Sequence, residues 1–179
     1  PERPHVGLAD GFLESAGRDC YSLEAQTIFF MIDLKPDSVL TVKFSGLLKL
    51  PVFNQGERGC LAVAEVAKQI PFPLKRFYVI SGVQSVSLVR GGHAHKSFQQ
   101  AIFVLAGSFD LLLDDGEQKQ NFRLSDPSLG LVLGPGLWHE LKNISPDAVI
   151  LVVSDSWFDE GDYLRDYAAF IAWQTKVDD

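Results

Sequence analysis

The stretch that decides the fold of this 179-residue chain is Arg90-Gly91-Gly92-His93-Ala94-His95-Lys96. The pattern is typical of a β-strand, in which side chains two positions apart point to the same face. His93 and His95 therefore project together. Imidazole has the ordinary pKa nearest neutrality, so one site can hold an acid and a base, or two metal ligands. Two histidines with a purely structural role are the alternative.

A second histidine segment lies further along, in Gly136-Leu137-Trp138-His139-Glu140-Leu141-Lys142-Asn143. Together with the first stretch, and the polar residue and glycine that follow it, this segment resembles the two motifs of the cupin superfamily. The resemblance implies an all-β protein, a cupin-type jelly-roll β-barrel. In metal-binding cupins it implies ligands at His93, His95, Gln100 and His139. Because a neutral glutamine stands where those cupins have a glutamate, the resemblance favours the fold more than a metal.

Short apolar stretches alternate with turn signals from Val42 onward, which predicts a sandwich or barrel of many strands. A good hairpin turn is expected at Asp115-Gly116. The expected strands cover 27–34, 47–53, 60–66, 76–80, 85–89, 100–105, 109–113, 121–124, 130–133, 140–144 and 148–153.

The C-terminal segment changes to helical spacing. We expect one α-helix there, with the acidic run Asp159-Glu160-Gly161-Asp162 at its positive N-terminal end. The aromatic residues of that helix are expected to pack on the outside of the barrel.

Composition favours a single globular domain, with 46% hydrophobic residues and a net charge of −7. An acidic chain does not attract nucleic acid or anionic membranes. No apolar run reaches the roughly 18 residues that a membrane span needs, and residues 1–10 lack the apolar core of a secretory signal. Cys20 and Cys60 lie far apart, which favours free thiols and a cytoplasmic location.

Longer stretches are similar to one branch of the cupins. They resemble the dTDP-4-keto-6-deoxyglucose 3,4-ketoisomerases, also described as WxcM-like sugar ketoisomerases. The resemblance covers most of the chain, from about Leu47 to Phe170. It rests on residues 70–78, 90–96, 113–116, 134–140 and 159–167.

Residues 1–40 are expected to be an N-terminal extension or linker, and residues 41–179 the cupin ketoisomerase domain. Some members of that family are fused to an acetyltransferase domain, so the extension fits a remnant of such a fusion. A fused or upstream acetyltransferase domain is therefore one expected partner. Pro1 fits a natural start after removal of Met, and equally a boundary inside a longer protein.

The reaction that the resemblance implies moves the carbonyl of a dTDP-sugar from C4 to C3 through an enediol. It needs a base with a pKa near neutrality. The resemblance places His93 and His95 in the active site, and a related epimerase family has its base at the position of His93. We expect His93 to be the carbon base and His95 to move protons between the oxygens. Tyr78 is the third expected catalytic residue, with a buried structural tyrosine as the alternative.

The dTDP-sugar is the expected ligand. The resemblance makes Arg90 a pyrophosphate ligand, and a guanidinium matches phosphate geometry. Strict alternation puts Arg90 on the face opposite His93, so a bulge at Gly91-Gly92 is needed to bring it inward. A solvated Arg90 and a packing role for Trp138 are the alternatives. The expected substrate-binding residues are Arg90, Arg76, Lys96, Gln100, Trp138 and His139.

No cofactor is expected, because ketone migration needs no net redox change and the chain has no Gly-x-Gly-x-x-Gly fingerprint. A homodimer is expected, because a barrel of short strands has edges to protect and the family is dimeric. Glu65 and Glu140 are candidates to orient a histidine. Two other function classes stay open: a metal-dependent cupin enzyme using His93, His95 and His139, and a non-catalytic cupin that binds a sugar.

Overall fold

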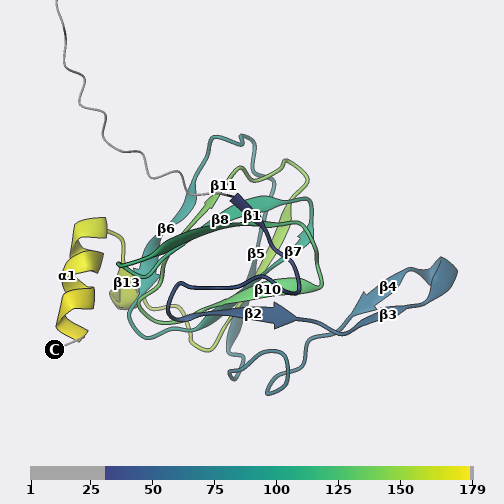
Figure 1. The fold of residues 1–179 in the computed structure, drawn as a ribbon, viewed down its shortest axis with the longest axis horizontal. Coiled ribbons are helices and arrows are strands. Elements are labelled where there is room, and N and C mark those ends of the chain that lie inside the picture. Colours follow the sequence, from purple (N-terminus) through teal and green to yellow (C-terminus); the bar gives the residue numbers. More distant parts are fainter. Residues whose placement is uncertain (1–30, 178–179) are drawn as a thin grey trace, which may run out of the picture.

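Two largely antiparallel sheets face each other in the structure, a computed structural model that describes residues 31–177 (Figure 1). The larger sheet has the order β1 (Met31–Asp33), β9 (Lys119–Leu124), β8 (Phe109–Asp114), β11 (Trp138–Lys142), β6 (Arg90–His95) and β13 (Tyr163–Leu164). The smaller sheet has the order β2 (Ser45–Lys49), β10 (Leu129–Leu133), β7 (Gln100–Ala106), β12 (Val149–Ser154) and β5 (Arg76–Ser81). The all-β prediction is confirmed, although the described strands form two facing sheets and a separate two-stranded hairpin rather than one closed ladder.

The core lies between the two sheets, where alternating side chains of each strand point inward. In β8, Phe109, Leu111 and Leu113 are all completely buried, as a period of two requires. They pack in the same cluster as Ile102 of β7 and Ile150 of β12, from the other sheet. Burying each such side chain contributes about 1.5–3 kcal/mol, so this layer holds the two sheets together.

The hairpin between β8 and β9 forms at the predicted turn. Gly116 has a φ of 91°, which glycine adopts without strain. Asp115 fixes the turn, because its Oδ1 accepts hydrogen bonds from the backbone N–H groups of Glu117 and Gln118 at 2.9 and 2.7 Å. Its Oδ2 accepts from the Lys43 N–H at 2.6 Å, which ties the preceding loop to the hairpin.

Several strand predictions differ from the structure. The predicted strand 85–89 is wrong: residues 82–89 form a loop in which Val86, Leu88 and Val89 are exposed. The predicted strand 47–53 is divided at Pro51, which has no N–H to donate to a ladder. After it, β3 (Val52–Asn54) pairs with β4 (Cys60–Ala62) and carries the short 3-10 helix η1 (Gly56–Arg58) at its tip.

The segment before the C-terminal helix also differs from its prediction. The acidic run does not begin the helix; Glu160–Asp162 form a 3-10 turn, η2, and β13 then pairs with β6. Helix α1 (Tyr167–Val177) starts later. It lies against the outside of the larger sheet (Figure 1), where Phe170 packs with Trp138 and Leu164. The predicted packing of its aromatic residues is confirmed.

Asp166 precedes α1 and caps its N-terminus, since its Oδ1 accepts a hydrogen bond from the Ala169 N–H at 2.7 Å. We expect Asp166→Ala to lower the free energy of unfolding by about 1 kcal/mol, because one N–H of the first helical turn loses its acceptor. Urea unfolding measures the change. Asp166→Asn keeps an acceptor oxygen and is the control; an equal loss in both variants would contradict the capping role.

The N-terminal boundary stays a prediction. β1 pairs in parallel with β9, so residues 31–33 extend the larger sheet although they lie within the predicted extension. Residues 27–30 of the first predicted strand, and Cys20, lie outside the described residues. Cys60 is exposed with a free thiol. No helix within residues 31–177 is long and apolar enough to cross a membrane.

Candidate active site

A β-bulge in β6 brings the residues of the site to one face. His93 pairs with His139 of β11, and Gly91 pairs with Glu140, so Gly92 is an extra residue in β6. Gly91 and Gly92 have φ values of 79° and 66°. The extra residue turns a spacing of three into an effective spacing of two. Arg90 and His93 therefore line the same cavity, as the Gly91-Gly92 pair predicted.

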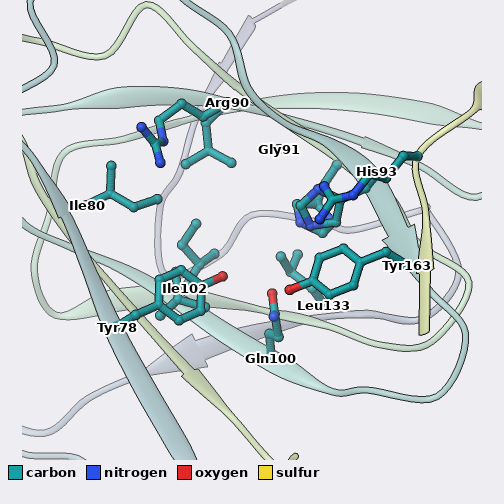
Figure 2. Close-up of a pocket in the computed structure, with 13 residues that line it drawn as sticks. Tyr78, Ile80, Arg90, Gly91, His93, Gln100, Ile102, Leu133 and Tyr163 are labelled. Atoms are coloured by element: carbon teal, nitrogen blue, oxygen red, sulfur yellow. The ribbon is translucent and has the colours of Figure 1, made fainter. Parts of the chain in front are cut away.

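The cavity lies between the two sheets and has a volume of about 210 Å³. Its polar groups come from both sides: His93 and His139 from the larger sheet, Tyr78 and Gln100 from the smaller one. Figure 2 shows the Gln100 amide and the hydroxyls of Tyr78 and Tyr163 directed toward the same space. Ile80, Ile102, Leu133, Leu141 and Val152 supply apolar walls. A few convergent polar groups in an apolar cavity are typical of a small-molecule site.

Three histidines form one cluster at this cavity. They are His93, His95 and His139. One ring nitrogen from each histidine lies within 4.8 Å of the corresponding nitrogens of the other two. Burial lowers the pKa of His93, and it lowers the pKa of His139 well below the usual range. Burial, with the nearby charge of His93, lowers the pKa of His95 to about 3. All three rings are therefore neutral at pH 7, and each has a lone pair that can accept a hydrogen bond or bind a metal ion.

His93 is the histidine of the first motif that reaches the cavity. It is half-buried and lies among the lining residues, whereas His95 is buried and is not one of them. His139 lines the cavity, and its Nδ1–H donates to the Leu137 carbonyl at 3.2 Å, which leaves Nε2 as an acceptor. Burial raises the pKa of Tyr78, so its hydroxyl keeps its proton at neutral pH.

Three predicted substrate-binding residues lie outside the cavity lining. The Lys96 ammonium donates to the Gly161 carbonyl at 2.7 Å. The Trp138 indole packs against Tyr167 and Phe170 and donates to Glu140 at 3.1 Å. Their roles in binding stay predictions.

Arg76 is the third. Its guanidinium lies 5.7 Å from the ring centre of Tyr78 and 5.8 Å from that of Phe98. Its buried Nε and Nη2 have no hydrogen-bond partner among residues 31–177. A guanidinium with unused donors beside the cavity can take an anion, so its binding role also stays a prediction.

Tyr163 and Arg165 line the cavity but were missed by the sequence reasoning. The Tyr163 ring centre lies 4.9 Å from that of His93, and Arg165 lies over the Tyr163 ring at 4.3 Å. Arg165 also forms two hydrogen bonds with Glu160, at 2.7 and 2.9 Å. Both residues stand in the segment predicted to be helical, whereas Tyr163 lies in β13 and Arg165 directly follows that strand.

Glu65 and Glu140 were the candidates to orient a histidine. Within residues 31–177, the structure shows no hydrogen bond or ion pair between either glutamate and a histidine. Glu65 is exposed and pairs with Lys68 at 2.7 Å. Glu140 pairs with Lys142 at 2.6 Å and accepts from the Trp138 indole. The carboxylate beside a histidine is that of Asp162, 3.5 Å from Nδ1 of His95.

Comparisons with known proteins identify the family of the chain. The family model FdtA, "WxcM-like, C-terminal", matches residues 43–175. The TDP-4-oxo-6-deoxy-alpha-D-glucose-3,4-oxoisomerase of Aneurinibacillus thermoaerophilus is 40% identical over 120 residues, covering 67% of this chain and 86% of the relative.

Solved structures of the same kind superpose on the chain. A double mutant of the QdtA 3,4-ketoisomerase from Thermoanaerobacterium thermosaccharolyticum, in complex with TDP, has a TM-score of 0.73 and 34% identity, and covers 76% of this chain and 97% of its own. A 3,4-ketoisomerase from Helicobacter canadensis has a TM-score of 0.70 and 34% identity, and the match covers 73% of this chain and 97% of that structure's chain. The predicted cupin-type jelly roll with a C-terminal helix is confirmed. The chain belongs to the FdtA family of WxcM-like proteins.

Proposed function

We propose that the chain is a nucleotide-sugar 3,4-ketoisomerase that converts dTDP-4-keto-6-deoxyglucose to a dTDP-3-keto-6-deoxyhexose. The observation that carries the proposal is a neutral His93 that faces, across one cavity, the Tyr78 hydroxyl and the Gln100 amide. The relatives named as TDP-sugar 3,4-isomerases support the substrate class. The isomerisation needs only proton transfers, which side chains of this cavity can carry out without a cofactor.

His93 takes the proton from C3 of the sugar, and the C–H electrons form the C3–C4 double bond of an enediolate. The oxygen on C4 accepts a proton, O3 loses one as the C3 carbonyl forms, and a proton returns to C4. Tyr78 and the buried Gln100 amide can donate hydrogen bonds to the oxygens where charge develops. His139 offers Nε2 as a second acceptor at the same cavity.

The nucleotide diphosphate needs local positive charge, because the whole chain carries −7. Arg90 and Arg165 line the cavity and supply it. Arg165 is held by Glu160, so binding of a diphosphate would exchange one anionic partner for another. Arg76, with unpartnered buried nitrogens among the described residues, supports a further contact to an anionic group.

The test of the function is product formation from dTDP-4-keto-6-deoxyglucose without added cofactor. A coupled 3-aminotransferase traps the unstable 3-keto product as a 3-amino sugar. NMR in heavy water should also show deuterium entering at C3 or C4. Failure to form any 3-amino sugar, together with failure to bind the substrate, would overturn the proposal.

Metal independence is expected, although the three clustered histidines are close enough to bind an ion. The fourth position of the cupin motif is Gln100, a neutral and buried amide, and the isomerisation moves only protons. Protein treated with a chelator should keep its full turnover, with elemental analysis confirming that metal was removed. Loss of activity that zinc, iron or manganese restores would favour the metal-dependent cupin enzyme.

A homodimer is expected, and the β3–β4 hairpin supports it. The hairpin projects away from both sheets (Figure 1), and Val52, Phe53 and Leu61 are each about half exposed. A two-stranded hairpin alone is marginal in water, so this apolar arm suits a contact with a second copy. Light scattering should give about twice 19.8 kDa at micromolar concentration. A mass near 19.8 kDa would contradict the dimer, and Phe53→Asp should shift the mass toward that value. The cytoplasmic location and the acetyltransferase partner stay predictions.

A further inference from the structure

Asp162 is a buried carboxylate that the mechanism above does not use. Its Oδ1 accepts two hydrogen bonds from Ser97, from the backbone N–H at 2.9 Å and from the hydroxyl at 2.6 Å. Its Oδ2 lies 3.5 Å from Nδ1 of His95 and has no hydrogen-bond partner among residues 31–177. One oxygen is thus fixed and the other is free for the imidazole.

The backbone around Asp162 holds this orientation. Its carbonyl accepts from the Lys96 N–H at 3.0 Å, and the neighbouring Gly161 carbonyl accepts from the Lys96 ammonium at 2.7 Å. β13 follows at once and pairs Tyr163 with His95. The backbone before and after the Asp162 side chain is therefore hydrogen-bonded to the end of β6. The two Ser97 bonds to Oδ1 then prevent rotation of the carboxylate away from His95.

The neutral His95 ring can carry its proton on either Nδ1 or Nε2. A neutral imidazole carries one N–H and one lone pair, and a carboxylate can only accept. The oxygen beside Nδ1 therefore selects the form with the proton on Nδ1. Nε2 is then an acceptor, in a ring that lies 5.0 Å from the His93 ring centre and 4.4 Å from that of Tyr163. The other charged groups that act on this ring are Arg76 and Arg165, which disfavour a second proton.

We propose that Asp162 is a positioning residue that fixes His95 as the Nδ1–H tautomer and so presents Nε2 as a hydrogen-bond acceptor within the histidine cluster. The His95 ring in turn holds the ring of His93 that faces the cavity, through an edge-on contact with ring centres 5.0 Å apart. The catalytic consequence rests on the proposed ketoisomerase function, whereas the tautomer does not.

Asp162→Asn separates this role from a structural one. The amide oxygen can still accept from Ser97, but the NH₂ group replaces the acceptor beside His95 and donates to Nδ1 instead. We expect His95 to change to the Nε2–H tautomer and kcat to fall roughly 10²-fold or more, as when an orienting carboxylate is replaced by its amide in a histidine dyad. KM should stay within a few-fold. Ser97→Ala removes the hydroxyl bond to Oδ1 but keeps the bond from the backbone N–H, which still holds Oδ2 beside Nδ1, so this variant should keep the wild-type tautomer and most of kcat.

Long-range ¹⁵N–¹H NMR of histidine-labelled protein reads the tautomer directly, with His95→Asn assigning the signal. The wild-type measurement needs no variant, so poor folding of Asp162→Asn does not remove the test. An Nε2–H tautomer in the wild type overturns the proposal, as does an Asp162→Asn variant with unchanged tautomer and kcat. An Nδ1–H tautomer in a protein that neither turns over nor binds the dTDP-sugar supports the positioning of His95 and overturns the proposed function instead.

Discussion

His93→Asn is expected to lower kcat for the 3,4-isomerisation about 10²–10⁴-fold, the usual cost of removing a general base. His93 is the histidine of the first motif that lines the cavity, and asparagine keeps approximate size without a group that takes up a proton at neutral pH. Single-turnover kinetics measures the chemical step, and circular dichroism confirms the fold. Turnover near the wild-type rate in a folded variant would remove His93 from the mechanism.

The pH profile gives this prediction a second readout. Burial lowers the pKa of His93, so the neutral, basic form persists as the pH falls through the ordinary histidine range. In the wild type, kcat/KM should therefore stay level down to about pH 6.5 and decline only below it. The variant should lose this acidic limb together with the rate. A wild-type decline that begins well above pH 6.5 would contradict a base with a lowered pKa.

The site could be predicted from sequence where a short-range rule was sufficient. The period of two in a strand predicted that His93 and His95 share one face, and the two glycines before them indicated the bulge that redirects Arg90. The same rule does not say how deep each side chain lies. His95 is buried because the rings of Tyr163 and Phe98 pack against it, and Tyr163 belongs to β13, which lies far from β6 in the sequence.

The remaining differences come from tertiary pairing that overrides a local pattern. The acidic run 159–162 fits a helix N-terminus by charge, yet its carbonyls and the Asp162 carboxylate are used to hold the end of β6. As a result, Tyr163 and Arg165 face the cavity from a strand and its following residue. Residues 85–89 carry apolar side chains, but they find no ladder partner and stay in an exposed loop.

Gly91→Ala is expected to lower the free energy of unfolding by about 2–4 kcal/mol, because two costs add at this position. The φ of 79° is strained for alanine, and an added Cβ would lie 2.7 Å from the His139 carbonyl oxygen. That oxygen belongs to the backbone of β11, so it cannot move without displacing the paired strand. Urea unfolding measures the loss, and the KM for the dTDP-sugar should rise because Arg90 and His139 are displaced together.

Gly92→Ala is the matched control in the adjacent residue. Its φ of 66° imposes the same left-handed strain, but no atom lies within 4 Å of the added Cβ. It should therefore cost only about 1–2 kcal/mol and leave KM nearly unchanged. The difference between the two variants isolates the contact with β11 from the strain of the backbone. Equal losses would mean that the bulge needs glycine for its conformation alone, and that the close approach of β6 to β11 does not set the position of Arg90.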